Sequence, residues 1–183
     1  MDKYKNKYRI ASARAQWWDY GWNGAYFITI CTHNRECFFG EIVQSQFIAS
    51  ASGQIAETIW HEIPTQFPYA ESGNFMVTPN HIYRILILNK PSDQQQHHQK
   101  KPPQIKSGGF AGNKNPMLHD NVSRIIRWYK GRCSFEIRKI QVNFAWQSRF
   151  HDHIIRNEVE YQHIANYIIN NPNNWTNDKF FNP

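Results

Sequence analysis

The hydrophobic positions of this chain alternate along its length between dense runs typical of strands and the spacing typical of helices. Residues 26–32 and 81–88 are dense runs of β-branched, aromatic and aliphatic side chains, which is typical of buried strands. Apolar residues at helical spacing mark residues 45–62 and 121–139 instead. In chain order the predicted elements are a strand at 26–32, a short returning strand at 37–42, a helix at 45–62, strands at 69–77 and 81–88, a helix at 121–139, a strand at 150–155 and a helix from 157 that Pro172 stops.

Capping and breaking residues predict the ends of two helices. Ser45 is expected to cap the first helix and Pro64 to end it. The buried stripe of that helix is predicted to consist of Ile48, Ile55, Ile59 and Ile63. Asn157, with Glu160 three residues later, indicates the start of the last helix.

The order of the main elements predicts an α+β fold. It matches a ferredoxin-like βαββαβ sandwich with an antiparallel sheet, an appended C-terminal helix and a basic N-terminal arm. Residues 1–183 are expected to form one domain. A low-complexity stretch at about 90–117 offers almost nothing to bury, so a mobile insertion is predicted there, with His97 and His98 in solvent.

Composition narrows the class of protein. Of the 183 residues, 40% are hydrophobic, which is enough for one core, and no long apolar run suggests a membrane span. No signal peptide is visible at the N-terminus, so a cytoplasmic location is expected. Cys31, Cys37 and Cys133 have no metal-type pairing and are interpreted as free thiols. A net charge of +7 favours a polyanionic partner, usually nucleic acid.

Two segments far apart in the chain predict one shared site. His81 and Tyr83 face the same side of a strand, and Tyr167 and Asn171 share a face of a helix. A phenol with a pKa of about 10 attacks poorly unless a base or a metal assists it. One imidazole, one amide and these phenols therefore suit a metal-assisted tyrosine nucleophile.

Other residues offer alternatives to this site. His151 and His153 form a second pair on one strand face, without an evident third ligand, and His163 shares the helix face of Tyr167. The helix at 121–139 carries cations that are candidates for phosphate contacts, namely Arg124, Arg127, Lys130, Arg132, Arg138 and Lys139. The aromatic residues at 17–18 and 144–146 can stack on unpaired bases or pack in the core.

Several of these segments resemble a known family. Residues 19–32, 79–83, 146–150, 152–157 and 167–172 are similar to REP-associated tyrosine transposases, which are single-tyrosine HUH transposases named for a His-hydrophobe-His motif. The resemblance runs from about Tyr8 to Phe181, with the insertion interrupting it. It implies a ferredoxin-like catalytic domain that binds single-stranded or hairpin DNA.

The resemblance also implies roles for individual residues. Tyr167 would be the nucleophile that forms a 5′-phosphotyrosine intermediate and leaves a free 3′-OH. His81 and Asn171 would bind Mg²⁺ or Mn²⁺, and the basic helix would follow the DNA backbone. Tyr83 stands where the family has its second histidine, so it is at best a doubtful replacement for a ligand.

Three functions remain open from the sequence. The first is a DNA-strand transferase of the transposase type, acting as a monomer or homodimer. Because Tyr83 replaces an imidazole, metal binding is expected to weaken by roughly 10- to 100-fold or more. The second is a non-catalytic protein that binds DNA hairpins, and the third is an interaction module without nucleic acid.

Overall fold

The computed structural model describes residues 18–91 and 119–181. Most of the predicted basic arm and of the predicted insertion, including His97 and His98, lies outside these residues. The elements are the strands β1 (Gly24–Cys31), β2 (Gly40–Val43), β3 (Gln46–Ala49), β4 (Ala70–Val77), β5 (His81–Leu88) and β6 (His151–Ile155), the helices α1 (Ala51–His61), α2 (Ile63–Gln66), α4 (Val122–Ile137) and α5 (Glu158–Ile169), and the 3₁₀ segments η2 (His33–Arg35) and η6 (Asn171–Asn177).

The main sheet has four antiparallel strands in the order β4-β5-β1-β6. Strand β5 lies inside the sheet, which explains why residues 81–88 read as a nearly continuous apolar run. Each crossover between the outer and inner strands carries a helix, α1 before β4 and α4 before β6. The predicted α+β, ferredoxin-like sandwich is therefore confirmed.

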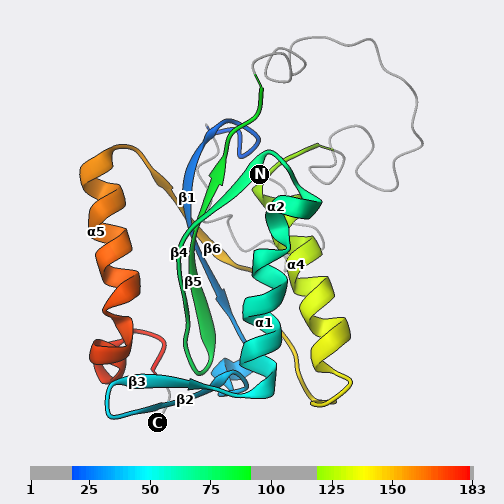
Figure 1. Cartoon of the computed structure of the whole chain (residues 1–183), viewed down its shortest axis with the longest axis vertical. Helices are drawn as coiled ribbons and strands as arrows, with labels where there is room; N and C mark the ends of the chain where they lie inside the picture. The colour runs from blue at the N-terminus through cyan, green and yellow to red at the C-terminus, as the bar shows by residue number, and fades with distance from the viewer. Residues whose placement is uncertain (1–17, 92–118, 182–183) are drawn as a thin grey trace, which may run out of the picture.

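Helices cover both faces of this sheet, with α5 on one side and α1 and α4 on the other (Figure 1). Successive residues of β5 divide between the two layers. Ile82 and Leu86 join the larger core under α1 and α4, whereas Tyr83 and Ile85 join the smaller core under α5. The face on which a residue lies thus decides which helix it meets.

The prediction that Ser45 starts a helix is wrong. Residues 46–49 instead pair with residues 40–43 in a separate two-stranded hairpin, and Ser45 lies in its turn with a φ of 63°. Helix α1 begins at Ala51, after Ser50, whose side-chain oxygen accepts the Gly53 N–H. Ile48 therefore leaves the predicted helical stripe and is half exposed on β3.

Two further details of this region differ from expectation. The short returning strand spans Gly40–Val43 rather than 37–42. Pro64 does not end the helical stretch but stands in the first turn of α2. The N–H groups of a first turn have no acceptor within the helix, so a proline there costs no hydrogen bond. Gly53 lets α1 approach Phe39, because a Cβ there would lie 2.1 Å from the Phe39 carbonyl oxygen.

Residues 18–91 and 119–181 contain no helix that could cross a membrane. None of their helices combines the length and the hydropathy that a bilayer span requires.

Candidate active site

The site begins at the first residue of β5, which a preceding turn fixes in place. The N–H of His81 donates to the Thr78 hydroxyl at 3.2 Å, and that hydroxyl donates to the His81 carbonyl at 2.8 Å. The His81 side chain is completely buried between the rings of Tyr83, Trp175 and Phe180. Its position is therefore set by packing on every side.

The hydrogen bonds of Asn80 fix which nitrogen of His81 carries the proton. The Asn80 amide nitrogen donates to the carbonyls of Arg35 and Phe180, so its oxygen can only accept. That oxygen lies 2.8 Å from His81 Nδ1, which must then bear the hydrogen. Burial lowers the pKa of His81 to about 3, against the opposing charge of Asp178. His81 is consequently neutral, with a bare lone pair on Nε2.

The other half of the site lies at the end of α5 and in η6, where one carboxylate collects three donors. Oδ2 of Asp178 accepts from the Tyr83 hydroxyl at 2.9 Å, the Tyr167 hydroxyl at 3.0 Å and the Asn171 amide at 2.7 Å. The hydroxyls of Tyr167 and Tyr83 lie 2.9 Å apart. The predicted pair from the strand and the predicted pair from the helix thus meet through Asp178.

Both phenols in this cluster hold their protons. Burial raises the pKa of Tyr83 far above its usual value, and the hydrogen bond with Tyr167 adds to that effect. Burial also raises the pKa of Tyr167, although the Tyr83 hydroxyl partly offsets this. Burial acts to raise the pKa of Asp178 as well, yet the hydrogen bonds from the Phe180 N–H, the Asn171 amide and the Tyr83 hydroxyl lower it. The cluster is thus one carboxylate with two neutral phenols.

Two buried acceptor atoms in the site lack a donor. Within the described residues, neither Nε2 of His81 nor Oδ1 of Asn171 has a hydrogen-bond partner. Buried acceptors of this kind are rare, and each one calls for a donor or a cation. An imidazole nitrogen and an amide oxygen are both ligands that Mn²⁺ and Mg²⁺ accept. His81 and Asn171 therefore fit the predicted role of metal ligands.

Tyr83 fits that role less well than its neighbours do. Its hydroxyl donates to Asp178, and a protonated phenol is a poor ligand for a hard cation. No cluster of three or more His, Cys, Asp or Glu side chains suited to a metal occurs in the described part of the chain. A cation at this site would consequently need the Asn171 amide among its ligands.

The rival histidines are placed apart from this cluster. His153 is exposed and contacts Glu160 at 2.6 Å. The ring of His151 lies 6.2 Å from that of Phe180, between centroids, so it sits at the edge of the site. His163 is exposed on α5, and no hydrogen bond joins it to Tyr167. None of the three meets the Asp178 carboxylate.

The predicted DNA-contacting cations lie on the opposite side of the sheet. Helix α4 packs with α1, whereas Tyr167 lies on α5 (Figure 1). Arg132 and Lys139 both pair with Glu136, and Arg132 also lies 3.9 Å from Glu62. Lys130 and Arg138 donate to the main-chain carbonyls of Gln147 and Phe144. Most of these cations therefore already have partners within the fold.

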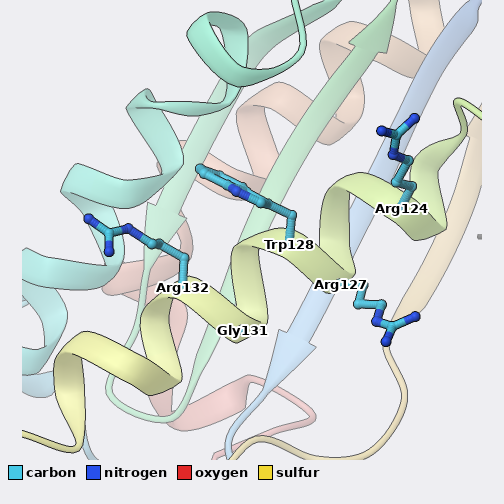
Figure 2. Close-up of a pocket in the computed structure, with 5 residues that line it drawn as sticks. All are labelled: Arg124, Arg127, Trp128, Gly131 and Arg132. Carbon is cyan, nitrogen blue, oxygen red and sulfur yellow. The ribbon is translucent and has the colours of Figure 1, made fainter.

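A shallow hollow of about 450 Å³ opens on α4, lined by Arg124, Arg127, Trp128, Gly131 and Arg132. Figure 2 shows Trp128 and Arg132 pointing from α4 toward α1, and Arg127 pointing away on the other side of the helix. Arg127 forms no ion pair with any residue in 18–91 or 119–181. A Cβ on Gly131 would meet no heavy atom within 4 Å. The hollow is therefore cationic and unobstructed.

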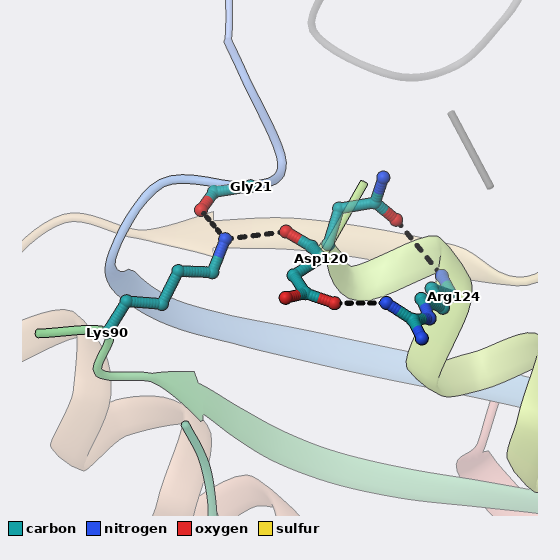
Figure 3. Close-up of polar contacts among 5 residues, drawn as sticks. Gly21, Lys90, Asp120 and Arg124 are labelled. Carbon is teal, nitrogen blue, oxygen red and sulfur yellow. Dashed lines mark hydrogen bonds and ion pairs between the residues drawn. The ribbon is translucent and has the colours of Figure 1, made fainter. Parts of the chain in front are cut away.

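The start of α4 is tied to two other segments (Figure 3). Nζ of Lys90 donates to the carbonyl of Gly21 at 2.6 Å and to that of Asp120 at 2.5 Å. The Asp120 carboxylate pairs with Arg124, one turn into the helix. The chain therefore leaves β5 and returns into α4 at nearly the same point.

The described aromatic residues considered for base stacking, Trp18, Phe144 and Trp146, pack in or against the core instead. Phe144 is buried and Trp146 packs beside it, with ring centroids 5.1 Å apart. The Trp146 indole N–H donates to the Lys130 carbonyl. Trp17 lies outside the described residues.

Comparison with known proteins gives one relative in sequence. An uncharacterized protein of Haemophilus influenzae is 30% identical over 171 residues, which cover 93% of this chain and 92% of that protein. The chain belongs to the same family as this protein. No family model matches the chain.

Solved structures add a likeness of fold. The structure of a REP-associated tyrosine transposase bound to a REP hairpin is similar to this chain, with a TM-score of 0.57. The match covers 90% of this chain and 74% of that one, at 21% sequence identity. At this identity the likeness concerns the fold alone.

Asp178 is the site residue that sequence reasoning missed. It lies 11 residues after Tyr167, beyond the end of α5, so no helical or strand spacing links the two. The fold brings it back because η6 turns the chain and the Phe180 N–H binds Oδ1 of Asp178 at 2.7 Å. The available signal was a lone carboxylate in residues 171–181, a segment that is otherwise rich in asparagine.

Proposed function

We propose that this protein is a DNA-strand transferase of the single-tyrosine transposase type, which acts on single-stranded or hairpin DNA. The observation that carries the proposal is the meeting of the Tyr167 hydroxyl, the Asp178 carboxylate and the Asn171 amide, with Tyr83 joining them to His81. Support also comes from the fold shared with a hairpin-bound transposase and from the net charge of +7.

In the proposed reaction the Tyr167 oxygen attacks a phosphodiester phosphorus. An O–P bond to tyrosine forms while the bond to the 3′ oxygen breaks, so the products are a 5′-phosphotyrosine and a free 3′-OH. The phenol loses one proton and the leaving oxygen gains one, so the step is balanced without an oxidant or an energy source. Tyr167 is 43% exposed, so part of its side chain faces solvent on the α5 side of the sheet.

A divalent cation, Mg²⁺ or Mn²⁺, would be held by Nε2 of His81 and Oδ1 of Asn171. When bound, such a cation neutralises charge on a phosphate under attack and favours ionisation of a phenol. Those two atoms suit the task because both are buried acceptors without a donor in the described residues. The chain itself holds the Tyr167 hydroxyl in place through Asp178.

DNA would also contact helix α4, on the other side of the sheet from Tyr167. The hollow offers the Trp128 ring to a base, and Arg127, on the other side of the same helix, offers a cation to a backbone phosphate. The ion pairs of Arg124 and Arg132 are exposed, so they are weak and a phosphate can compete for these side chains. A hairpin that reaches both sides of the domain would account for the separation.

The experiment incubates the protein with Mn²⁺ and a labelled hairpin oligonucleotide, then separates the products on a denaturing gel. A covalent adduct that disappears in Tyr167→Phe is expected. The control Tyr161→Phe removes another phenol of the same helix and should leave the adduct unchanged. An adduct that persists in Tyr167→Phe would contradict the proposed nucleophile.

A second candidate is a non-catalytic protein that binds DNA hairpins. The favouring observation is that Tyr83 occupies the expected place of an imidazole and engages the Tyr167 hydroxyl at 2.9 Å. In this case the wild-type protein forms no adduct, whereas Tyr83→His, which restores an imidazole, forms one. Hairpin binding that is unchanged in Tyr167→Phe and weakens steeply with salt would then identify a binder.

A further inference from the structure

Asp178 occupies a fixed position in contact with the Asn171 amide, and its charge acts on the His81 ring. Its Oδ1 accepts only the Phe180 N–H, at 2.7 Å, among the bonds found in the described residues. Its Oδ2 binds the amide nitrogen of Asn171, so the amide that carries the free Oδ1 of Asn171 is in direct contact with the carboxylate. The Phe180 carbonyl in turn accepts from Asn80, the residue that orients His81.

The charge of the site is the second observation. Among His81, Tyr83, Tyr167, Asn171 and Asp178, only the aspartate carries a formal negative charge. A divalent cation in a buried site needs anionic or lone-pair ligands that replace its water. The Tyr83 hydroxyl keeps its proton, which it donates to Asp178, and its oxygen already accepts from Tyr167, so it is a poor ligand for a hard cation. A carboxylate oxygen is the type of ligand that Mg²⁺ and Mn²⁺ prefer.

We propose that Asp178 supplies the cation ligand that Tyr83 cannot supply, so that an imidazole, an amide oxygen and a carboxylate form the binding set of this chain. This inference rests on the proposed function, because it concerns the cation of that same site. Asp178 thereby has two tasks: it positions the Tyr167 hydroxyl in the free protein and holds the cation in the loaded one. The exchange is chemically simple, since a cation competes with hydrogen-bond donors for the same oxygen.

The test measures Mn²⁺ binding directly, without DNA, from the loss of the free Mn²⁺ signal in electron paramagnetic resonance. The proteins compared are the wild type, Asp178→Asn, Tyr83→His with Asp178→Asn, and Tyr83→Phe with Asp178→Asn. Asn keeps the shape of the side chain but not its charge. Circular dichroism of each variant checks that the fold is retained.

We expect Asp178→Asn to weaken Mn²⁺ binding by roughly 10- to 100-fold. Adding Tyr83→His should restore most of the affinity, because a second imidazole then replaces the lost carboxylate. Adding Tyr83→Phe should restore none, because a phenyl ring has no ligand atom. Glu158→Gln, which removes an exposed carboxylate at the far end of α5, is the charge control and should bind as the wild type does.

Three results would overturn the inference: a wild type that binds no Mn²⁺, an Asp178→Asn variant that binds as tightly as the wild type, or a loss that Tyr83→His does not restore. The last result would mean that Asp178 acts only through its hydrogen bonds. Failure of the proposed function looks different. A wild type that binds Mn²⁺ through Asp178 but forms no DNA adduct overturns the enzyme and leaves the ligand assignment standing.

Discussion

The hydroxyl groups of Tyr83 and Tyr167 lie 2.9 Å apart, and both reach the same oxygen of Asp178. Each phenol has one proton to donate. If Tyr83 donates to Asp178, its oxygen is free to accept from Tyr167, and the single Tyr167 proton is then shared between the Tyr83 oxygen and Oδ2 of Asp178, so the three groups form a triangle of contacts. The residue that stands in place of an expected imidazole therefore restrains the proposed nucleophile, rather than activating it.

Removing the Tyr83 hydroxyl should destabilise the protein modestly. Tyr83→Phe deletes the bond to Asp178 and the bond from Tyr167, while the stacked ring contact with Phe27 remains. We expect the free energy of unfolding to fall by about 1–2 kcal/mol, measured by urea denaturation. Tyr161→Phe is the matched control, since the only hydrogen bond of the Tyr161 hydroxyl among the described residues, to Asn74, is long at 3.5 Å. Equal losses in the two variants would contradict the triangle.

The protein should become less stable as the pH is lowered, because of His81. Burial lowers its pKa to about 3 in the folded protein, whereas an unfolded histidine has a pKa of about 6.5. Between these values the unfolded chain binds a proton that the folded one does not, so unfolding becomes more favourable as the pH falls through 6.5 toward 3. The slope from this one group is at most about 1.4 kcal/mol per pH unit.

The pH prediction is checked by urea denaturation between about pH 4.5 and 6.5, with a chelator present. Asp178 stays ionised in this window, because its pKa lies below the ordinary aspartate value of 3.8. His81→Gln cannot titrate, so its stability should depend less on pH than that of the wild type. If the free energy of unfolding depends on pH in the same way for both proteins, His81 binds its proton equally in the folded and the unfolded chain, and the prediction is wrong.

Arg84 should be dispensable for folding. Its side chain is fully buried on β5, and its guanidinium nitrogens have no hydrogen-bond partner among the described residues. Its compensation is a position 3.7 Å from the Phe75 ring centroid and 4.9 Å from that of Trp60, together with the nearby Tyr129 and Glu57, which act against the effect of burial on its pKa. Burial lowers the pKa of Arg84, which reflects how poorly this site accommodates the charge.

Arg84→Met should therefore stabilise the protein by about 1–2 kcal/mol, because an unbranched apolar chain of similar length removes an unpaired buried charge. Thermal unfolding measures the change. Arg84→Lys is the control: it keeps a charge, loses the planar stacking and should destabilise. A destabilised methionine variant would mean that the ring contacts outweigh the cost of burying the charge.

The fold was predictable from the sequence where burial and period agree, and the site was predictable only in part. The run at 81–88 could be recognised because β5 is buried on both faces. The prediction at Ser45 was wrong because a polar residue before apolar ones suits a hairpin turn as well as a helix N-cap. Only the pairing between 40–43 and 46–49 decides between the turn and the cap. His81 and Tyr167 followed from local spacing, whereas Asp178 depends on a return of the chain that no local pattern encodes.

The hydrogen bonds of Lys90, called the Lys90 clamp below, hold the end of β5 next to the start of α4. They predict that the segment between β5 and α4 can be shortened. Lys90 joins Gly21 and Asp120, and Asn23 exchanges two hydrogen bonds with the Lys90 main chain. Replacing residues 93–117 by a short Gly/Ser linker should change the free energy of unfolding by less than about 1 kcal/mol. Lys90→Met is the contrasting variant. It leaves two carbonyls without their donor and should destabilise by about 1–3 kcal/mol. A shortened protein that fails to fold would refute the clamp.

Helix α4 offers a test that separates DNA contact from fold stability. Gly131 sits inside an exposed stretch of helix, where glycine is unfavourable by about 0.5–1 kcal/mol relative to alanine, and no neighbour requires it. Gly131→Ala should therefore stabilise the protein by about that amount in thermal unfolding. If a DNA backbone approaches the hollow closely at this point, the same substitution should weaken hairpin binding.

Arg127→Ala provides the electrostatic counterpart in the same hollow. Arg127 has no ion pair in the described residues, so its charge is available to a phosphate, whereas Lys139 is already paired with Glu136. In a fluorescence titration with a labelled hairpin at several salt concentrations, Arg127→Ala should reduce the slope of log affinity against log salt by about 1. Lys139→Ala removes the same charge outside the hollow and should change the slope less. Equal slopes for both variants and the wild type would place the DNA contact elsewhere on the molecule.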